Sequence, residues 1–178
     1  MPHLVFVFGT LKEGFPNFGT NMGARVPGEF ITMQRFPLYL VGDRFSPWLI
    51  VSPGAGHQVV GQVFEVEQAA LTLMDKLERI DEADGYRRQF IDIAPRETIP
   101  VAPFGVFAYL KAPEHLTITE VRLGPLAEYT MEHAALYRSR ALSPPSSGRP
   151  ATAAQVERWT AYPHPVSLSR HENTTNQV

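Results

Sequence analysis

The sequence contains no cysteine among its 178 residues. This absence excludes disulfide bonds, thiolate metal ligands and a cysteine nucleophile, and it fits a reducing compartment. The chain also has no apolar run near the roughly 20 residues that a membrane-spanning helix needs. Its first residues lack the basic segment and the cleavage site of a signal peptide. We therefore expect a cytoplasmic protein with no membrane partner.

The sequence also lacks an excess of either charge. Lysine and arginine total 16, aspartate and glutamate total 18, and the net charge is −2 at pH 7. Nucleic-acid-binding domains normally carry a basic excess or a basic stripe, whereas the arginines here are scattered, so we expect no nucleic-acid partner. Hydrophobic residues make up 44% of the chain, which is enough for one domain with its own core.

Several common catalytic and metal-binding motifs are absent. The six histidines are dispersed and form neither an H-x-H nor an H-E-x-x-H pair, which argues against a zinc site. There is no G-x-S-x-G elbow for a serine hydrolase, and the glycines near Lys12 miss the spacing of a phosphate-binding loop. The acidic stretch 81–85 misses the EF-hand spacing, so we interpret it as a solvated loop rather than a calcium site.

Hydrophobic periodicity predicts several strands and one helix. Strands are expected at Leu4–Phe8, Gly28–Val41 with an interruption at Pro37, Trp48–Val51, Val59–Val66, Tyr86–Ile93 and Phe104–Leu110. The period changes to that of a helix within Glu67–Ile80. The predicted apolar face of this helix consists of Ala70, Leu73, Met74 and Leu77. This order of elements indicates an α+β domain around one sheet.

The C-terminal part of the chain has a different composition. A helix is expected within Leu123–Arg140, with Gly124-Pro125 near its start. The stretch 143–150 is rich in serine and proline and predicts a linker, a short helix is expected within 151–161, and the polar tail after it is expected to be disordered. We therefore expect one domain over residues 1–140, followed over 141–178 by a linker, an extra helical segment and a tail.

The turn after the first predicted strand is one candidate for a functional site. If the strand ends at Phe8 and the chain turns away, the main-chain amides of Gly9, Thr10 and Leu11 have no partners in a ladder. Glycine permits a tight bend and the close approach of a ligand. Such amides can hold a carboxylate or an oxyanion, although an ordinary turn has the same pattern.

Glu78 is the second candidate. On the predicted helix it lies at i+4 from Met74 and i+7 from Leu71, so it shares a stripe with two apolar side chains. Partial burial raises the pKa of a carboxyl group toward neutrality, which suits a general base. The alternative is a surface glutamate near the end of an amphipathic helix. On the same helix, Asp75 and Arg79 are spaced for an i,i+4 ion pair on the solvent side.

Both candidates lie in segments that resemble one known family. V-F-V-F-G-T-L-K-E-G-F-P-N, residues 5–17, resembles the Y-G-T-L-K-x-G-x-x-N signature of γ-glutamyl cyclotransferase-like (AIG2-like) proteins, and above all their γ-glutamylamine cyclotransferase branch. Further matches to that branch follow in order at P-W-L-I-V-S-P-G-A-G (47–56), V-V-G-Q-V-F-E-V (59–66) and M-D-K-L-E (74–78). The last corresponds to a Leu-Asp-x-Phe-Glu segment that supplies the family's catalytic glutamate. The resemblance extends over roughly Leu4 to Leu110.

The resemblance implies a fold and a reaction. The fold is a small mixed β-barrel or sheet with a packed helix. The α-amine of a γ-glutamyl amine or isopeptide attacks its own side-chain carbonyl, so that 5-oxoproline forms and the amine leaves, without a metal or an organic cofactor. Glu78 is implied as the general acid and base. The residues that we expect to bind the substrate are Phe8, Gly9, Thr10, Leu11, Lys12, Asn17, Trp48, Tyr86 and Tyr109.

The chain departs from the family pattern in two places, and alternatives follow. Phe8 replaces a tyrosine, and the family's Tyr-x-Arg corresponds here to Tyr86 followed by Arg87 and Arg88, either of which fits. The aromatic residues expected in the pocket are equally suited to a core. The competing hypotheses are an enzyme for a pathway-specific γ-glutamyl amide and a binding module without turnover. Neither the leaving amine nor the oligomeric state follows from the sequence.

Overall fold

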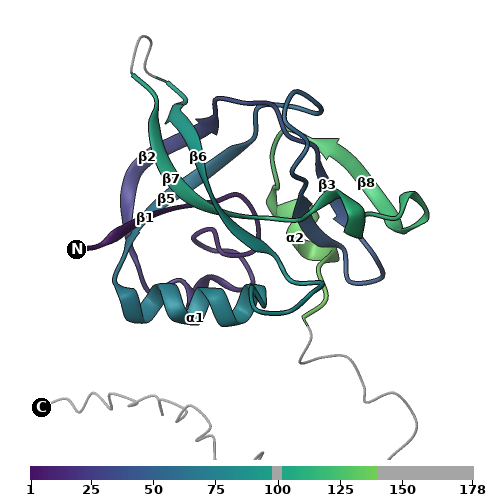
Figure 1. Cartoon of the computed structure of the whole chain (residues 1–178), viewed down its shortest axis with the longest axis horizontal. Coiled ribbons are helices and arrows are strands. Elements are labelled where there is room, and N and C mark those ends of the chain that lie inside the picture. The colour runs from purple at the N-terminus through teal and green to yellow at the C-terminus, as the bar shows by residue number, and fades with distance from the viewer. Residues whose placement is uncertain (98–101, 140–178) are drawn as a thin grey trace, which may run out of the picture. The chain divides into compact units, whose positions relative to one another are not determined.

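The computed structural model describes residues 1–97 and 102–139. Five of its strands form a closed barrel. The order around the barrel is β1 (His3–Val7), β5 (Val60–Val66), β2 (Ala24–Thr32), β6 (Arg87–Pro95) and β7 (Phe104–Leu110). The barrel closes through a parallel contact of β1 with β7, in which Val5 lies opposite Phe107, and its other pairings are antiparallel (Figure 1).

A second sheet lies at the end of β7. It has three antiparallel strands in the order β4 (Ser46–Leu49), β3 (Leu38–Val41) and β8 (Val121–Leu126). The main-chain amide of Lys111, directly after β7, donates to the carbonyl of Leu49 at 2.7 Å. The end of the barrel strand therefore continues into the second sheet, and both sheets contribute to the region between them.

The alternation of side chains along β1 and β5 produces two apolar clusters. Phe6 and Val63 belong to the cluster that fills the barrel, whereas Val5 and Phe64 point outward and pack with helix α1 (Gln68–Glu78). All four residues are buried, because successive side chains of a strand face opposite sides and both sides are covered here. This explains why the strands read as continuous apolar runs.

The buried face of α1 differs from the predicted one. Ala70, Leu71 and Met74 are buried, and Leu77 packs against the same cluster. Leu73, which the spacing assigned to the core, is 43% exposed, so that part of the prediction is wrong. The contact stripe includes Leu71 instead, while Ala70, Met74 and Leu77 lie on it as predicted.

The segment predicted as one strand over Gly28–Val41 is two strands in different sheets. β2 ends at Thr32 in the barrel, and β3 begins immediately after Pro37 in the second sheet. Proline has no amide hydrogen to donate to a ladder, which makes it a natural break. The strands expected near β1, β4, β5, β6 and β7 are present with boundaries within two residues of those predicted, and β7 matches at both ends.

A helix is present within Leu123–Arg140 as predicted, but Gly124-Pro125 lies in a strand and not near the helix start. The first part of this range is strand β8, which pairs with β3, and only α2 (Met131–Leu136) is α-helical. Short 3₁₀ turns lie at η1 (Phe18–Thr20), η2 (Pro113–His115) and η3 (Ile118–Glu120). The linker, helix and tail expected over 141–178 lie outside the described residues.

The expected fold class is nevertheless confirmed, since a small closed barrel carries one packed helix on its outer face. All described residues belong to one compact unit, Met1–Ser143. Among their helices, none has both the length and the apolar character that crossing a membrane requires.

Candidate active site

A cavity of about 610 Å³ lies between the end of the barrel and the second sheet. Its walls come from the turn after β1, the β3–β4 hairpin, the C-terminal end of α1 and the residues after β7. The sequence-predicted site residues among those that line it are Phe8, Gly9, Thr10, Leu11, Asn17, Trp48, Glu78, Tyr86 and Tyr109. Lys12 does not line the cavity, because its side chain turns to the other side of the loop.

The turn after β1 places Gly9, Thr10 and Leu11 in the cavity wall. No acceptor within the described residues pairs with their main-chain amides, whereas the carbonyl of Gly9 accepts a 3.1 Å hydrogen bond from the amide of Lys12. A Cβ atom at position 9 would lie 2.8 Å from Cγ of Pro47, so this close contact requires glycine. The turn thus combines tight packing on β4 with amides that can hold an anion or a polarised oxygen.

Asn17 connects this turn to another part of the cavity rim. Its side-chain amide donates to Oγ1 of Thr10 at 2.9 Å and to the hydroxyl of Tyr137 at 3.2 Å. The main-chain amide of Asn17 also donates to the carbonyl of Thr10 at 2.8 Å. Since Tyr137 lines the cavity as well, the turn and the chain after α2 form one hydrogen-bonded unit.

Glu78 is the last residue of α1 and is half-buried in the cavity wall. One turn before it, Met74 is completely buried against the barrel. The helix then ends because Arg79 takes the left-handed conformation with φ of 57°. The main-chain amide of Tyr86 donates to the carbonyl of Glu78 at 2.9 Å. The backbone that carries Glu78 is therefore fixed on both sides.

Asp75 holds the same end of α1 on the barrel. Its carboxylate accepts a hydrogen bond from the Tyr109 hydroxyl at 2.7 Å and pairs with Arg88 at 2.5 Å. The expected solvent-side pair between Asp75 and Arg79 is wrong, because the left-handed turn at Arg79 directs that side chain away from the helix. Of the two arginines left open by the sequence, Arg88 contacts α1 through Asp75, whereas Arg87 is exposed.

Arg79 pairs instead with the acidic loop that follows the helix. It donates to the carboxylates of Glu82 and of Asp84, the latter at 2.9 Å. This hydrogen bond holds the pKa of the Asp84 carboxyl below its ordinary value. In the parts of the chain that the structure describes, no group of three or more histidine and acidic side chains is arranged to hold a metal ion.

Lys111 is a cavity residue that the sequence reasoning missed. It is 4% exposed, and its ammonium lies 4.5 Å from the ring centroid of Trp48 and 4.6 Å from that of Tyr86. The Tyr86 hydroxyl donates to the carbonyl of Pro47 at 3.0 Å, which fixes this ring. The three side chains form a polarised wall rather than a purely apolar one. Its sequence signal is a lysine directly after the apolar run Phe104–Leu110.

Other lining residues come from loops and 3₁₀ turns that no sequence period marks. They are Asp43, Arg44, Asp84, His115, Glu120, Tyr137 and Ser139. These side chains give the rim both acidic and basic groups. Loop residues of this kind enter a site only through the fold, which brings the β3–β4 hairpin next to the chain after α2.

Comparisons with known proteins agree with this fold and these motifs. Residues 5–129 match the family model described as "Gamma-glutamyl cyclotransferase, AIG2-like". A γ-glutamylaminecyclotransferase of Mus musculus is 38% identical over 79 residues, which are 42% of this chain and 53% of that protein. The human protein of that name is 34% identical over 122 residues, 61% of this chain and 78% of its own length. The match thus spans about half the length of the mouse relative.

A solved structure has a similar fold. The crystal structure of an AIG2-like protein from Mus musculus superposes with a TM-score of 0.65 at 28% identity, covering 83% of this chain and 99% of that one. A uropathogenic E. coli-specific protein, 21% identical with a TM-score of 0.51, shares the fold alone. The family model covers well over half of the sequence, from β1 to the residue before the cap of α2. The chain belongs to the γ-glutamyl cyclotransferase, AIG2-like family.

Proposed function

We propose that this chain is a γ-glutamylamine cyclotransferase, which converts a γ-glutamyl amine into 5-oxoproline and the free amine. One observation carries the proposal: Glu78 and the amide-bearing turn Gly9–Leu11 line the same cavity. The names of the mouse and human relatives supply the substrate class. The cavity volume of about 610 Å³ also falls in the range of small-molecule sites.

Glu78 acts as the general base and then as the general acid. The α-amine of the substrate is an ammonium group at neutral pH, and its nitrogen has no lone pair for attack until one proton leaves. Glu78 accepts that proton, the amine nitrogen bonds to the γ-carbonyl carbon, and a tetrahedral intermediate forms. The proton then passes from Glu78 to the leaving nitrogen as the amide bond breaks. As the lactam forms, its ring nitrogen gives up its second proton, which leaves with the released amine as an ammonium ion. Atoms and charge then balance without any co-reactant.

The turn Gly9–Leu11 binds negative charge on the substrate. Its amides either stabilise the oxyanion of the tetrahedral intermediate or hold the α-carboxylate, and both roles need donors without a protein acceptor. Ring closure further requires that the γ-glutamyl chain folds back on itself. A site that holds this conformer lowers the barrier by about 7–11 kcal/mol in favourable cases. Trp48, Tyr86 and Tyr109 supply the walls that confine the chain.

Release of 5-oxoproline from ε-(γ-glutamyl)-lysine tests the proposal. Wild type should turn over, and Glu78→Gln should lose activity, because glutamine keeps the shape and removes the base. Glu67→Gln is the matched control, since Glu67 is exposed just before the same helix and does not line the cavity. Full activity of Glu78→Gln would reject Glu78 as the base.

Phe8 is the observation that favours the second candidate, a binding module without turnover. Phe8 is buried in the cavity wall at the position where the family pattern has a tyrosine hydroxyl. If wild type binds 5-oxoproline or a γ-glutamyl amide in a calorimeter but releases no product from any γ-glutamyl amide tested, the binding module replaces the enzyme. A pathway-specific amide is indicated instead if other γ-glutamyl amides are cleaved and the lysine isopeptide is not.

A further inference from the structure

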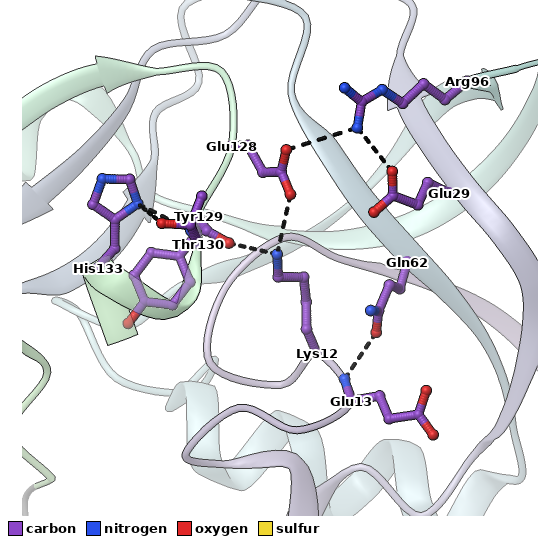
Figure 2. Close-up of polar contacts among 9 residues, drawn as sticks. All are labelled: Lys12, Glu13, Glu29, Gln62, Arg96, Glu128, Tyr129, Thr130 and His133. Atoms are coloured by element: carbon purple, nitrogen blue, oxygen red, sulfur yellow. Dashed lines mark hydrogen bonds and ion pairs between the residues drawn. The ribbon is translucent and has the colours of Figure 1, made fainter. Parts of the chain in front are cut away.

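Lys12 directly follows the amide-bearing turn but points away from the cavity. Its side chain is 6% exposed, and its ammonium donates to the main-chain carbonyl of Tyr129 at 2.5 Å (Figure 2). The ammonium also lies 4.0 Å from the carboxylate of Glu128 and 4.3 Å from the centre of the Phe15 ring. Lys12 thus joins two chain segments that lie more than a hundred residues apart in the sequence.

Burying the charged side chain of a lysine at this position costs free energy. Burial lowers the pKa of Lys12 below its ordinary value, and the nearby carboxylates of Glu128 and Glu29 only partly oppose that effect. A well-packed apolar side chain of the same length often replaces a buried charge without loss of stability. The directed bond of the ammonium to one carbonyl therefore points to a role in positioning rather than in stability.

The segment that receives this bond is itself fixed to the barrel. The amide of Val60 in β5 donates to the carbonyl of Ala127 at 2.9 Å, next to Glu128. The Glu128 carboxylate lies 3.7 Å from the guanidinium of Arg96, which pairs with Glu29 of β2 at 2.8 Å (Figure 2). We call this segment, Ala127–Thr130, the platform. Because it is anchored to two barrel strands, a bond to it fixes the turn relative to the barrel.

The same segment leads to the cavity rim. Thr130 caps α2 through a reciprocal pair of hydrogen bonds with His133, and the chain after α2 carries Tyr137. The Tyr137 hydroxyl accepts from Asn17, whose side chain also donates to Thr10 in the turn. Turn, platform and rim therefore form a closed ring of contacts, with Lys12 joining turn to platform.

We propose that Lys12 is a positioning residue, which holds the turn Gly9–Leu11 in place against the platform Ala127–Thr130. It acts from behind the cavity wall and sets where the three amides lie relative to Glu78. This inference rests on the proposed function for its effect on turnover. Its effect on the position of the turn does not depend on turnover.

Lys12→Met tests the proposal, because methionine fills nearly the same space without an ammonium. We expect kcat/KM for 5-oxoproline release to fall by roughly 10- to 100-fold, as for a displacement of about 1 Å at a catalytic group. The melting temperature should stay close to that of wild type. Lys12→Arg keeps a donor of similar reach and should recover part of the activity.

Two controls separate positioning from simple support of the fold. Ile93→Ala opens a cavity in the barrel core away from the turn, so it should lower the melting temperature and leave kcat/KM of the folded protein unchanged. Glu128→Gln removes one charge but leaves the Tyr129 carbonyl as acceptor, so its activity should stay above that of Lys12→Met. If Lys12→Met keeps wild-type kcat and KM, the proposal is rejected.

Amide chemical shifts provide a readout that needs no turnover. In ¹H–¹⁵N spectra, the Gly9, Thr10 and Leu11 amides should shift in Lys12→Met and stay in place in Ile93→Ala. Unchanged turn amides in Lys12→Met overturn the proposal whether or not the wild type is active. Shifted amides in an inactive wild type retain the positioning role and reject only the proposed reaction.

Discussion

The hydroxyl of Tyr109 donates a 2.7 Å hydrogen bond to Oδ1 of Asp75, three residues before Glu78 on the same helix. Tyr109 lies on barrel strand β7, and Asp75 lies on α1, the helix that carries the proposed base. This contact, together with the ion pair from Arg88 of β6, sets the rotation of the last turn of α1 against the barrel. The cavity wall is thus fixed through a carboxylate that is not itself proposed to react.

Tyr109→Phe removes that hydroxyl and should loosen the end of the helix. A hydrogen bond to a charged group contributes about 1.5–3 kcal/mol, so we expect a loss of that order in the free energy of unfolding. kcat/KM should fall by roughly 10-fold as Glu78 becomes less well placed. Urea denaturation and the 5-oxoproline assay measure both. Tyr39→Phe in β3, outside the cavity lining, is the matched control and should change neither quantity.

The substitutions Arg88→Met and Arg87→Met test the ion pair with Asp75. Only Arg88 makes this pair, and Arg87 is its neighbour in the chain. Without Arg88, the half-buried carboxylate of Asp75 loses its ion-pair partner. The free energy of unfolding should therefore fall by about 1–3 kcal/mol. Arg87→Met should have little effect because that side chain is exposed. Equal effects of the two substitutions in urea denaturation would contradict the role of Arg88 in holding Asp75.

Gly9→Ala should displace the turn that carries the amides of Gly9, Thr10 and Leu11. Its new methyl group would meet Cγ of Pro47 at 2.8 Å, and overpacking of this kind costs about 1–3 kcal/mol. We expect lower stability together with a reduced kcat/KM. Gly19→Ala is the matched control, since a Cβ atom there meets no atom within 4 Å. The account is wrong about this turn if Gly9→Ala is as active and as stable as Gly19→Ala.

The lowered pKa of Lys12 predicts a pH dependence of stability with a definite sign. In the folded protein Lys12 loses its proton at a lower pH than in the unfolded chain, where its pKa is near 10.5. Between these two pKa values the unfolded state binds more protons, so the free energy of unfolding rises with pH. The free energy of unfolding of wild type should therefore rise relative to that of Lys12→Met as the pH rises toward 10.5. A difference that is constant or falls over that range would contradict the assigned pKa shift.

The sequence predicts the barrel strands β1, β5, β6 and β7 and the helix α1 well, because apolar runs and the helix period mark them. It fails where tertiary contacts decide the outcome. Leu123 lies in a strand because β3 pairs with that segment, and Leu73 is exposed because of how the helix turns on the barrel. No local pattern contains this information. The boundary at residue 140, the cytoplasmic location and the absence of a cofactor stay predictions.

The sequence also predicts part of the candidate site, but not the direction of every side chain in it. Matched motifs identify Glu78 and the turn around Gly9, and the structure brings them to one cavity. Lys12 belongs to the same motif, yet its side chain turns to the platform, since its neighbour Leu11 already occupies the wall. Arg79 escapes prediction because its backbone leaves the helix at that residue. Spacing along a chain predicts which residues share an element, but not which way a terminal side chain points.

The most direct test of the central claim is a crystal structure of the Glu78→Gln variant with ε-(γ-glutamyl)-lysine bound. The account predicts the γ-glutamyl group in the cavity, its α-amine within hydrogen-bond distance of the side chain at position 78, and a substrate oxygen on the amides of Gly9–Leu11. A substrate bound elsewhere, or one whose α-amine points away from position 78, would contradict it.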